Sequence, residues 1–554
     1  MNPIENEELK REYLSWQQRR LQEALSRFNR AHPDQPVGLF SNLFTFHWLQ
    51  QEIHPNYRIE VIKRVGLDQS EALTTLLLQE ADESQYIQGL LSHWLQEADE
   101  KQPQYQQVQQ WMARYDDQLP DAADAILTAW EKLAIFRKSR IESVRRIQAG
   151  QKQTVSEVGG ETDRQRLTLV DKLPNRFTRP SPFEKIGLIP QIACPESCRH
   201  CMFVWRPPLK DSPDSALLLQ RINKEANNVL FTGGDLSQSL SELYRAIREM
   251  DNIQIFAILL NGSSATSPEE ATTLFEAIRH ALANRPAAFM PAQVTLQISF
   301  DEYHQEITSN SKGQLKERIP VACIANLVAQ SVHYPEIQLV LLHKQNRLNF
   351  SKNLFQVGVF ARLSRALSQR GVGVASINWH TSPRAKSDPL NPARKGGVIR
   401  DALFTLEGFP NRPIHMMSST IDAYGRAALL DPSEYINEKD YLQQILSDGP
   451  PSQERFDIDP MVWYDGSVTL FSASHFWIGD LFEEGDKVFQ RYQKDPLLNA
   501  LERFDATLLD LFSEKDSSLE TLINRSTGPH HLFHQLTESA AMRLHLTKRL
   551  ADLG

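Results

Sequence analysis

The stretch GLIPQIACPESCRHCMF, residues 187–203, joins a short apolar run to a loop that carries three cysteines. Its first half has the length and composition of a buried β-strand. Similar runs follow it, each separated from the next by enough residues for a helix. They are NVLFTGG (228–234), IQIFAILL (253–260), QVTLQISF (293–300), IQLVLLH (337–343) and VGVASINW (372–379). This alternation predicts parallel strands with crossover helices, hence an α/β barrel or open sheet whose chemistry gathers at the carboxyl ends of its strands.

The segments on either side of this region have different patterns. In the N-terminal part, apolar residues recur with helical spacing and show no catalytic constellation. Polar residues, Gly159-Gly160 and several prolines then predict a linker, and near the other end Asp465-Gly466 indicates a hairpin turn. The predicted units are a helical domain over 1–150, a linker over 151–182, an α/β body over 183–430 and a small α+β domain over 431–554.

The overall composition is that of a globular protein. The chain has 554 residues, of which 41% are hydrophobic, and a formal net charge of −9. The negative charge argues against nucleic acid as a partner, because phosphate binding relies on clustered Lys and Arg. No apolar run approaches the roughly 20 residues of a membrane helix, and the N-terminal sequence lacks the apolar core of a signal peptide. We therefore expect a cytoplasmic protein with no membrane partner.

Cysteine usage indicates a metal site. Only four cysteines occur, and Cys194, Cys198 and Cys201 form a C-x3-C-x2-C set on one loop. Three thiolates on one loop can hold three irons of a four-iron cluster and leave the fourth iron open for a small molecule. A zinc site completed by His200 is an alternative, as is a set of unligated buried thiols. Cys323 stands alone in an apolar helical stretch and is interpreted as a packing residue.

The position of this cysteine set after a first strand resembles the signature of the radical S-adenosylmethionine (radical SAM) superfamily. The resemblance implies a partial (β/α)6 TIM-like barrel over 183–430 and a [4Fe-4S] cluster on Cys194, Cys198 and Cys201. It also implies that S-adenosylmethionine binds the open iron through its amino and carboxylate groups. Phe203, which follows the last cysteine, is then expected to shield the cluster and lie near the adenine.

Two further strand ends resemble family motifs. Gly233, Gly234 and Asp235 are similar to the Gly-Gly-Glu that meets the amino group of the methionine moiety, with Asp in place of Glu. On this basis, Gly234→Val is expected to weaken cofactor binding and to spare the cluster. Ser299 and Asp301 lie where the family places polar side chains against the ribose or the substrate.

Candidate catalytic residues follow the later strands. Asp301 is one of them, and His304 is a candidate acid or base, or else an ordinary surface or core histidine. Arg384 follows the run at 372–379, and Arg426 lies in a Gly-Arg-Ala that resembles the segment after the sixth strand of many family members. Either arginine could pair with a carboxylate of the cofactor or substrate, or be structural.

The resemblance also implies the type of reaction. One electron, from a donor such as flavodoxin or ferredoxin, enters the cluster, and S-adenosylmethionine splits to give a 5′-deoxyadenosyl radical that abstracts a substrate hydrogen. The segment VWYDGSVTLFSASHFWIGDLFEEG resembles a SPASM or twitch extension without the cysteines for an auxiliary cluster. This favours a peptide or protein substrate over a small metabolite or sugar. A non-catalytic metal-binding protein is the third hypothesis.

Overall fold

The computed structural model describes Arg30 and most of the chain from Val155 to Leu553. The residues that it does not describe are 1–29, 31–154, 197, 199, 204–205, 211–213, 302, 306, 310–314, 345–357, 382–399, 430–436, 452–453 and 554. The helical domain predicted for 1–150, apart from Arg30, and the candidate Arg384 therefore lie outside the described residues.

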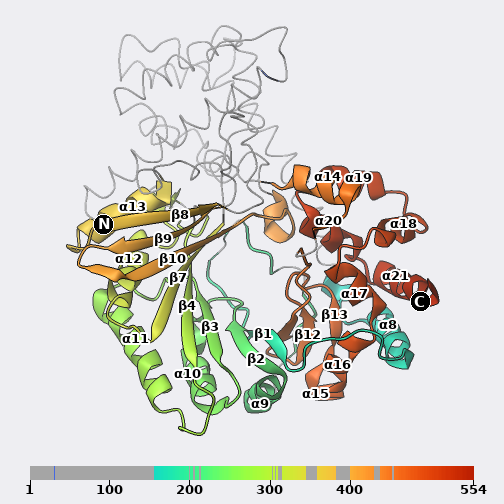
Figure 1. Cartoon of the computed structure of the whole chain (residues 1–554), viewed down its shortest axis with the longest axis horizontal. Coiled ribbons are helices and arrows are strands. Elements are labelled where there is room, and N and C mark those ends of the chain that lie inside the picture. The colour runs from blue at the N-terminus through green and yellow to red at the C-terminus, as the bar shows by residue number, and fades with distance from the viewer. Residues whose placement is uncertain are drawn as a thin grey trace, which may run out of the picture.

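In the described part of the chain, eleven strands form one sheet in the order β13-β12-β11-β1-β2-β3-β4-β7-β10-β9-β8 (Figure 1). The strands are β1 (Phe183–Ile189), β2 (Ala226–Phe231), β3 (Ile255–Leu260), β4 (Gln293–Ser299), β7 (Ile337–Lys344), β8 (Val374–Thr381), β9 (Arg400–Leu406), β10 (Phe409–Ser419), β11 (Pro460–Trp463), β12 (Ser467–Leu470) and β13 (Trp477–Asp480). A separate antiparallel pair consists of β5 (Ile307–Ser309) and β6 (Leu315–Glu317). Seven neighbouring strands, from β11 to β10, run parallel. Their carboxyl ends therefore meet at one edge of the sheet.

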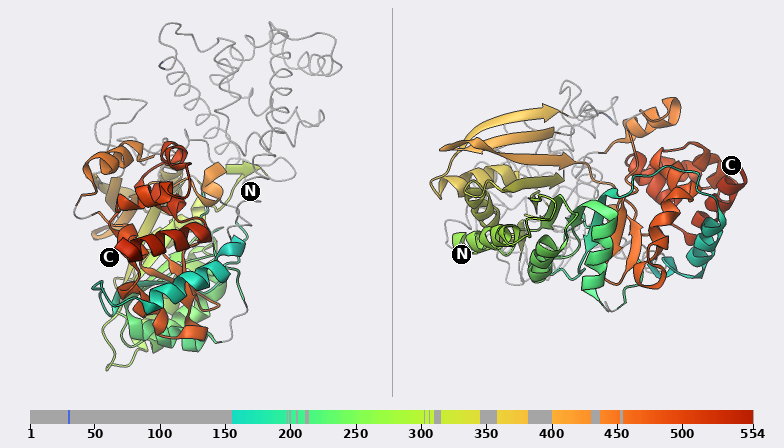
Figure 2. Two further views of the ribbon diagram at one scale, coloured as in Figure 1. Left: turned by 90° about the vertical axis from the view of Figure 1, so that its right-hand side faces the viewer. Right: turned by 60° about the horizontal axis from the view of Figure 1, so that its bottom comes forward.

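Helices join these strands and pack on the same side of the sheet (Figures 1 and 2). They are α9 (Ser215–Glu225), α10 (Leu240–Glu249), α11 (Pro268–Ala283), α12 (Val321–Ser331) and α13 (Gly358–Ser368). Helix α11 shows why they form: Ser267 and Glu270 make a reciprocal capping box at its start. Its buried residues recur at helical spacing, so one face of the helix is apolar and packs into the core. The mixed α/β class predicted from the sequence is confirmed.

The sixth parallel strand is β10, which pairs with β7. The run at 372–379, predicted to belong to the parallel strands, instead lies at the sheet edge as β8 and pairs antiparallel with β9. The chain returns along β9 and turns at Gly408, which has a φ of +81°, into β10. That return places β10 beside β7 and β8 two strands away, which corrects the position predicted for this run.

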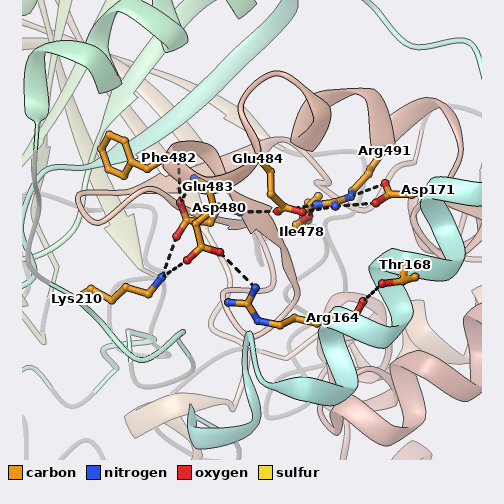
Figure 3. Close-up of polar contacts among 10 residues, drawn as sticks. All are labelled: Arg164, Thr168, Asp171, Lys210, Ile478, Asp480, Phe482, Glu483, Glu484 and Arg491. Atoms are coloured by element: carbon orange, nitrogen blue, oxygen red, sulfur yellow. Dashed lines mark hydrogen bonds and ion pairs between the residues drawn. The ribbon is translucent and has the colours of Figure 1, made fainter.

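The range predicted as a linker contains helix α8 (Glu161–Lys172), which contacts β13 and α21 (Ala540–Leu553). Asp163 of α8 binds Arg543 through two hydrogen bonds of 2.9 and 2.7 Å, with both side chains fully buried. Asp171 of α8 pairs with Arg491 at 2.9 Å (Figure 3). This part of the range is helical because Asp163 and Asp171 form ion pairs inside the protein, while other charged residues of the stretch, such as Glu161 and Arg164, face solvent.

The C-terminal range extends the same sheet. Strand β11 pairs parallel with β1, and β12 returns antiparallel after a turn at Gly466, which has a φ of +87°. The remaining helices are η5 (Gly425–Leu429), α14 (Lys439–Asp448), α15 (Leu481–Glu484), α16 (Lys487–Gln490), η6 (Arg491–Gln493), α17 (Pro496–Glu502), α18 (Thr507–Ser513), α19 (Leu519–Arg525), α20 (Pro529–Leu536) and α21. Among the described residues, apolar side chains from the α/β body and this range form one continuous core. No helix in the described segments combines the length and apolar character needed to cross a membrane.

Candidate active site

The cysteine loop leaves the carboxyl end of β1, at the sheet edge where the parallel strands end. Cys194 is exposed, Cys201 is half-buried and Cys198 is buried. The backbone N–H of Cys201 donates to the carbonyl of Cys198 at 3.3 Å, which turns the chain between them. The three thiols are close enough to affect one another electrostatically. The structure thus brings the three predicted ligands together.

Burial governs the protonation of the Cys194 and Cys198 thiols. Burial raises the pKa of Cys198 to about 12, although the guanidinium of Arg318 opposes the shift. Burial also raises the pKa of Cys194. Thiols of this kind stay protonated near neutral pH, so a metal must displace their protons when it binds.

The spacing of the sulfur atoms bears on the type of metal. One zinc ion with Zn–S bonds of about 2.3 Å would hold its sulfurs about 3.8 Å apart. Among the described residues, the three cysteine sulfurs do not form a group whose members all lie within 4.8 Å of one another. A cluster that offers a different iron to each thiolate needs wider spacing. The type of metal that the three cysteines bind stays a prediction.

The Gly-Gly-Asp segment after β2 packs directly on the cysteine loop. The N–H of Gly234 donates to the carbonyl of Gln191 at 3.1 Å, and the N–H of Asp235 donates to that of Ala193 at 2.9 Å. A Cβ atom on Gly234 would lie 2.3 Å from the Ala193 carbonyl oxygen and 2.6 Å from that of Ile192. This geometry contradicts the expectation that Gly234→Val would spare the cluster, because the new side chain meets the lead-in to the cysteines.

The other residues of this motif also have local roles. Gly233 has a φ of +131°, a backbone conformation that favours glycine. The Asp235 carboxylate is buried and accepts a hydrogen bond of 3.1 Å from the N–H of Ser237, which caps η3 (Leu236–Ser239). Contact of these residues with a cofactor remains a prediction.

Asp301, two residues beyond the end of β4, is the best-anchored carboxylate at this edge and is 1% exposed. Its Oδ1 accepts hydrogen bonds of 2.9 Å from the N–H groups of Tyr303 and His304. Its Oδ2 lies 3.0 Å from His304 Nδ1 and 3.7 Å from His200 Nε2. Although burial opposes ionisation, the two imidazoles hold the pKa of Asp301 well below its usual range. The His200 side chain thus faces Asp301 in the loop after β4.

The remaining predicted residues have varied positions. Ser299 ends β4, and its carbonyl accepts a hydrogen bond of 3.3 Å from Gln305 Nε2. Phe203 packs edge-on against Trp463 of β11, with 6.3 Å between the ring centroids. Arg426 lies in η5 after the sixth parallel strand, but its side chain, like Arg384, lies outside what the structure describes. The proposed adenine, ribose and substrate contacts stay predictions.

Lys344 is a candidate that the sequence reasoning missed. It ends β7 at the same edge, and its ammonium group donates to the carbonyl of Thr420 at 3.2 Å. Burial lowers its pKa, while Asp422 and Asp301 act in the opposite direction. The signal was present in the sequence, since Lys344 directly follows the apolar run at 337–343. A partly buried amine at this edge of the sheet is a group that can bind an anion or exchange a proton.

Comparisons with known proteins add little to this geometry. No family model and no curated protein matches the sequence. One solved structure that the chain resembles is described as native anSMEcpe with bound AdoMet and Cp18Cys peptide. The match covers 67% of this chain and 98% of that one, with 12% sequence identity and a TM-score of 0.31. A likeness of this size carries no argument about function, which must be inferred from the site itself.

Proposed function

We propose that this chain is a radical SAM enzyme with one [4Fe-4S] cluster on Cys194, Cys198 and Cys201. The observation that carries the proposal is the position of the C-x3-C-x2-C loop. It leaves the carboxyl end of β1 and is hydrogen-bonded to the Gly-Gly-Asp segment at the end of β2. Two motifs that resemble consecutive motifs of the superfamily are thus in direct contact, although about 40 residues separate them in the sequence.

The residues at this edge suit such a cofactor set. When bound, the cluster and S-adenosylmethionine would supply a 5′-deoxyadenosyl radical that abstracts a hydrogen atom from the substrate. Phe203 packs on Trp463 and so adds apolar surface next to the last cysteine of the loop. Asp301 holds the His304 imidazole at Nδ1, which leaves Nε2 to donate or accept a proton.

For the substrate, we propose a peptide or protein that undergoes maturation. The support is the C-terminal range, which resembles a SPASM-type extension and extends the sheet beside β1. Rearrangement, elimination or oxidation of a small metabolite or sugar is the alternative, and Lys344 offers such a molecule a cation at the same edge. We further propose a cytoplasmic location and an electron donor such as flavodoxin or ferredoxin.

Anaerobic reconstitution tests the proposal. Purified protein should take up about four irons and four sulfides per chain and should release 5′-deoxyadenosine from S-adenosylmethionine under reducing conditions. Cys198→Ala should lose both properties, whereas Cys323→Ala, at a buried cysteine in α12, should keep both. Bound zinc, about eight irons per chain, or 5′-deoxyadenosine release by Cys198→Ala would reject the assignment.

A further inference from the structure

A second cluster of metal-ligand side chains lies beside the cysteine loop. It consists of His200, Asp301 and His304. Each residue offers one possible metal-ligand atom, and the three atoms all lie within 4.8 Å of one another. Within the described residues, it is the only group of three or more His, Cys, Asp or Glu side chains that meets this criterion. The cysteine sulfurs are not part of it.

The distances suit one ion. Bonds of about 2.1 Å to nitrogen or oxygen place two donors about 3.0 Å apart at a right angle and about 4.2 Å apart when they lie opposite each other. His304 Nδ1 and His200 Nε2 lie 3.0 and 3.7 Å from Asp301 Oδ2. Both separations fall within that range, and the third, between the two imidazole donors, is at most 4.8 Å.

The carboxylate is fixed in the orientation that such a site requires. Two backbone N–H groups hold Asp301 Oδ1, and the N–H of Asp301 donates to Gln305 Oε1 at 2.8 Å. Oδ2 therefore faces the two imidazoles. Partners of this kind, which orient a ligand from behind, typically raise metal affinity 10–100-fold.

Ring packing fixes the imidazoles as well. The His200 ring lies 4.9 Å from the Tyr303 ring and 4.6 Å from the His304 ring, centroid to centroid. His200 and Asp301 belong to loops after β1 and β4, about 100 residues apart in the sequence. The fold thus assembles the three donors before any ion arrives.

We propose that His200, Asp301 and His304 bind one divalent transition-metal ion next to the cysteine loop. Two imidazoles and one carboxylate suit Zn²⁺, Fe²⁺ or Co²⁺ and leave coordination positions open for water or substrate. The ion takes the place of the proton that His304 and Asp301 share in the metal-free protein. The site does not depend on the iron–sulfur cluster, so it stands or falls separately from the proposed function.

Co²⁺ is the probe, because its absorption spectrum distinguishes sulfur ligands from nitrogen and oxygen ligands. It is added anaerobically to the full-length chain with its cluster loaded, and to a variant with Cys194→Ala, Cys198→Ala and Cys201→Ala. Both proteins should bind about one Co²⁺ per chain by metal analysis. The triple variant, whose spectrum has no cluster absorption, should show visible Co²⁺ bands without the near-ultraviolet bands of thiolate coordination. Retention in the triple variant separates this site from the cysteine loop.

Ligand variants then locate the ion. His304→Ala and Asp301→Asn should each weaken Co²⁺ binding at least tenfold, whereas His280→Ala, at an exposed histidine of α11, should leave it unchanged. Circular dichroism confirms that each variant is folded, and Asn at 301 keeps an oxygen for the two backbone N–H groups. No Co²⁺ in the triple cysteine variant, or unchanged affinity in His304→Ala, would overturn the proposal and leave a His–Asp–His hydrogen-bond network.

Discussion

Gly234→Ala tests how tightly the strand β2 end and the cysteine loop are joined. The new Cβ atom would lie 2.3 Å from the carbonyl oxygen of Ala193 and 2.6 Å from that of Ile192. Because these are backbone atoms, no side-chain rotation relieves the contact. The loop lead-in must move by about 0.7 Å to reach even 3.0 Å.

The cost follows from the contacts involved. Overpacking of a core position typically costs about 1–3 kcal/mol. The hydrogen bonds that the N–H groups of Gly234 and Asp235 donate to the loop contribute about 0.5–1.5 kcal/mol each. If the shift breaks both, the free energy of unfolding falls by about 2–6 kcal/mol. Since the same loop carries the cysteines, iron content should fall together with stability.

Urea unfolding and iron content per chain measure the two effects. Gly371→Ala is the matched control, because a Cβ there meets nothing within 4 Å and the change imposes only the strain of a φ of +73°. The control should lose about 1–2 kcal/mol and keep its iron. Full iron loading in Gly234→Ala would refute the close packing of this glycine on the cysteine loop.

Two further predictions concern buried histidines of the C-terminal range and the ion pairs that join helix α8 to that range. Burial lowers the pKa of His475 and His534, and it lowers the pKa of His531 to about 4. Each of these histidines has its ordinary pKa of 6.5 in the unfolded chain, so below pH 6.5 the unfolded chain binds more protons than the folded protein. The free energy of unfolding is therefore highest above pH 6.5 and falls toward pH 4, by up to about 1.4 kcal/mol per pH unit for each histidine. In urea unfolding, His531→Gln should make the free energy of unfolding depend less on pH over this range. The same pH dependence as in the parent protein would refute the assignment. Asp163→Asn should cost about 3–5 kcal/mol because it leaves a buried guanidinium without its carboxylate. Arg164→Ala, which removes a half-exposed ion pair with Glu483, should cost less than about 1 kcal/mol; equal losses in urea unfolding would contradict this distinction.

The strands of the α/β body could be predicted because their signal is local. Each of β1, β2, β3, β4 and β7 contains a short stretch rich in apolar residues. In β3 and β4 fully buried residues alternate with half-buried ones, as expected where helices cover one face of the sheet. The position of β8 in the sheet could not be predicted from its own sequence. It depends on the return through β9, and on which strand then reaches the free side of β7.

The contacts of α8 and of His200 could not be predicted from the sequence, for a common physical reason. Charged residues in a sequence usually indicate solvent, but Asp163 is fully buried because Arg543, about 380 residues later, neutralises it. His200 was weighed only against the adjacent cysteines. Its observed neighbour, Asp301, reaches it because parallel strands end at one edge. Pairings of this kind follow from the completed fold and have no signal within either segment alone.

The cysteine loop is held on three sides by parts of the chain that are distant in sequence. The β2 end binds its lead-in, and Asp301 beyond β4 faces His200 within it. Beyond the loop, the N–H of Lys210 donates to Asp465 at 3.0 Å and its ammonium group lies 3.1 Å from Asp480 (Figure 3). Asp465 and Asp480 belong to the C-terminal range, so that range fixes the exit of the loop as well as extending the sheet. These contacts at the entry, middle and exit restrict the described residues of the loop, and such pre-organisation lowers the conformational entropy lost on binding a metal cluster.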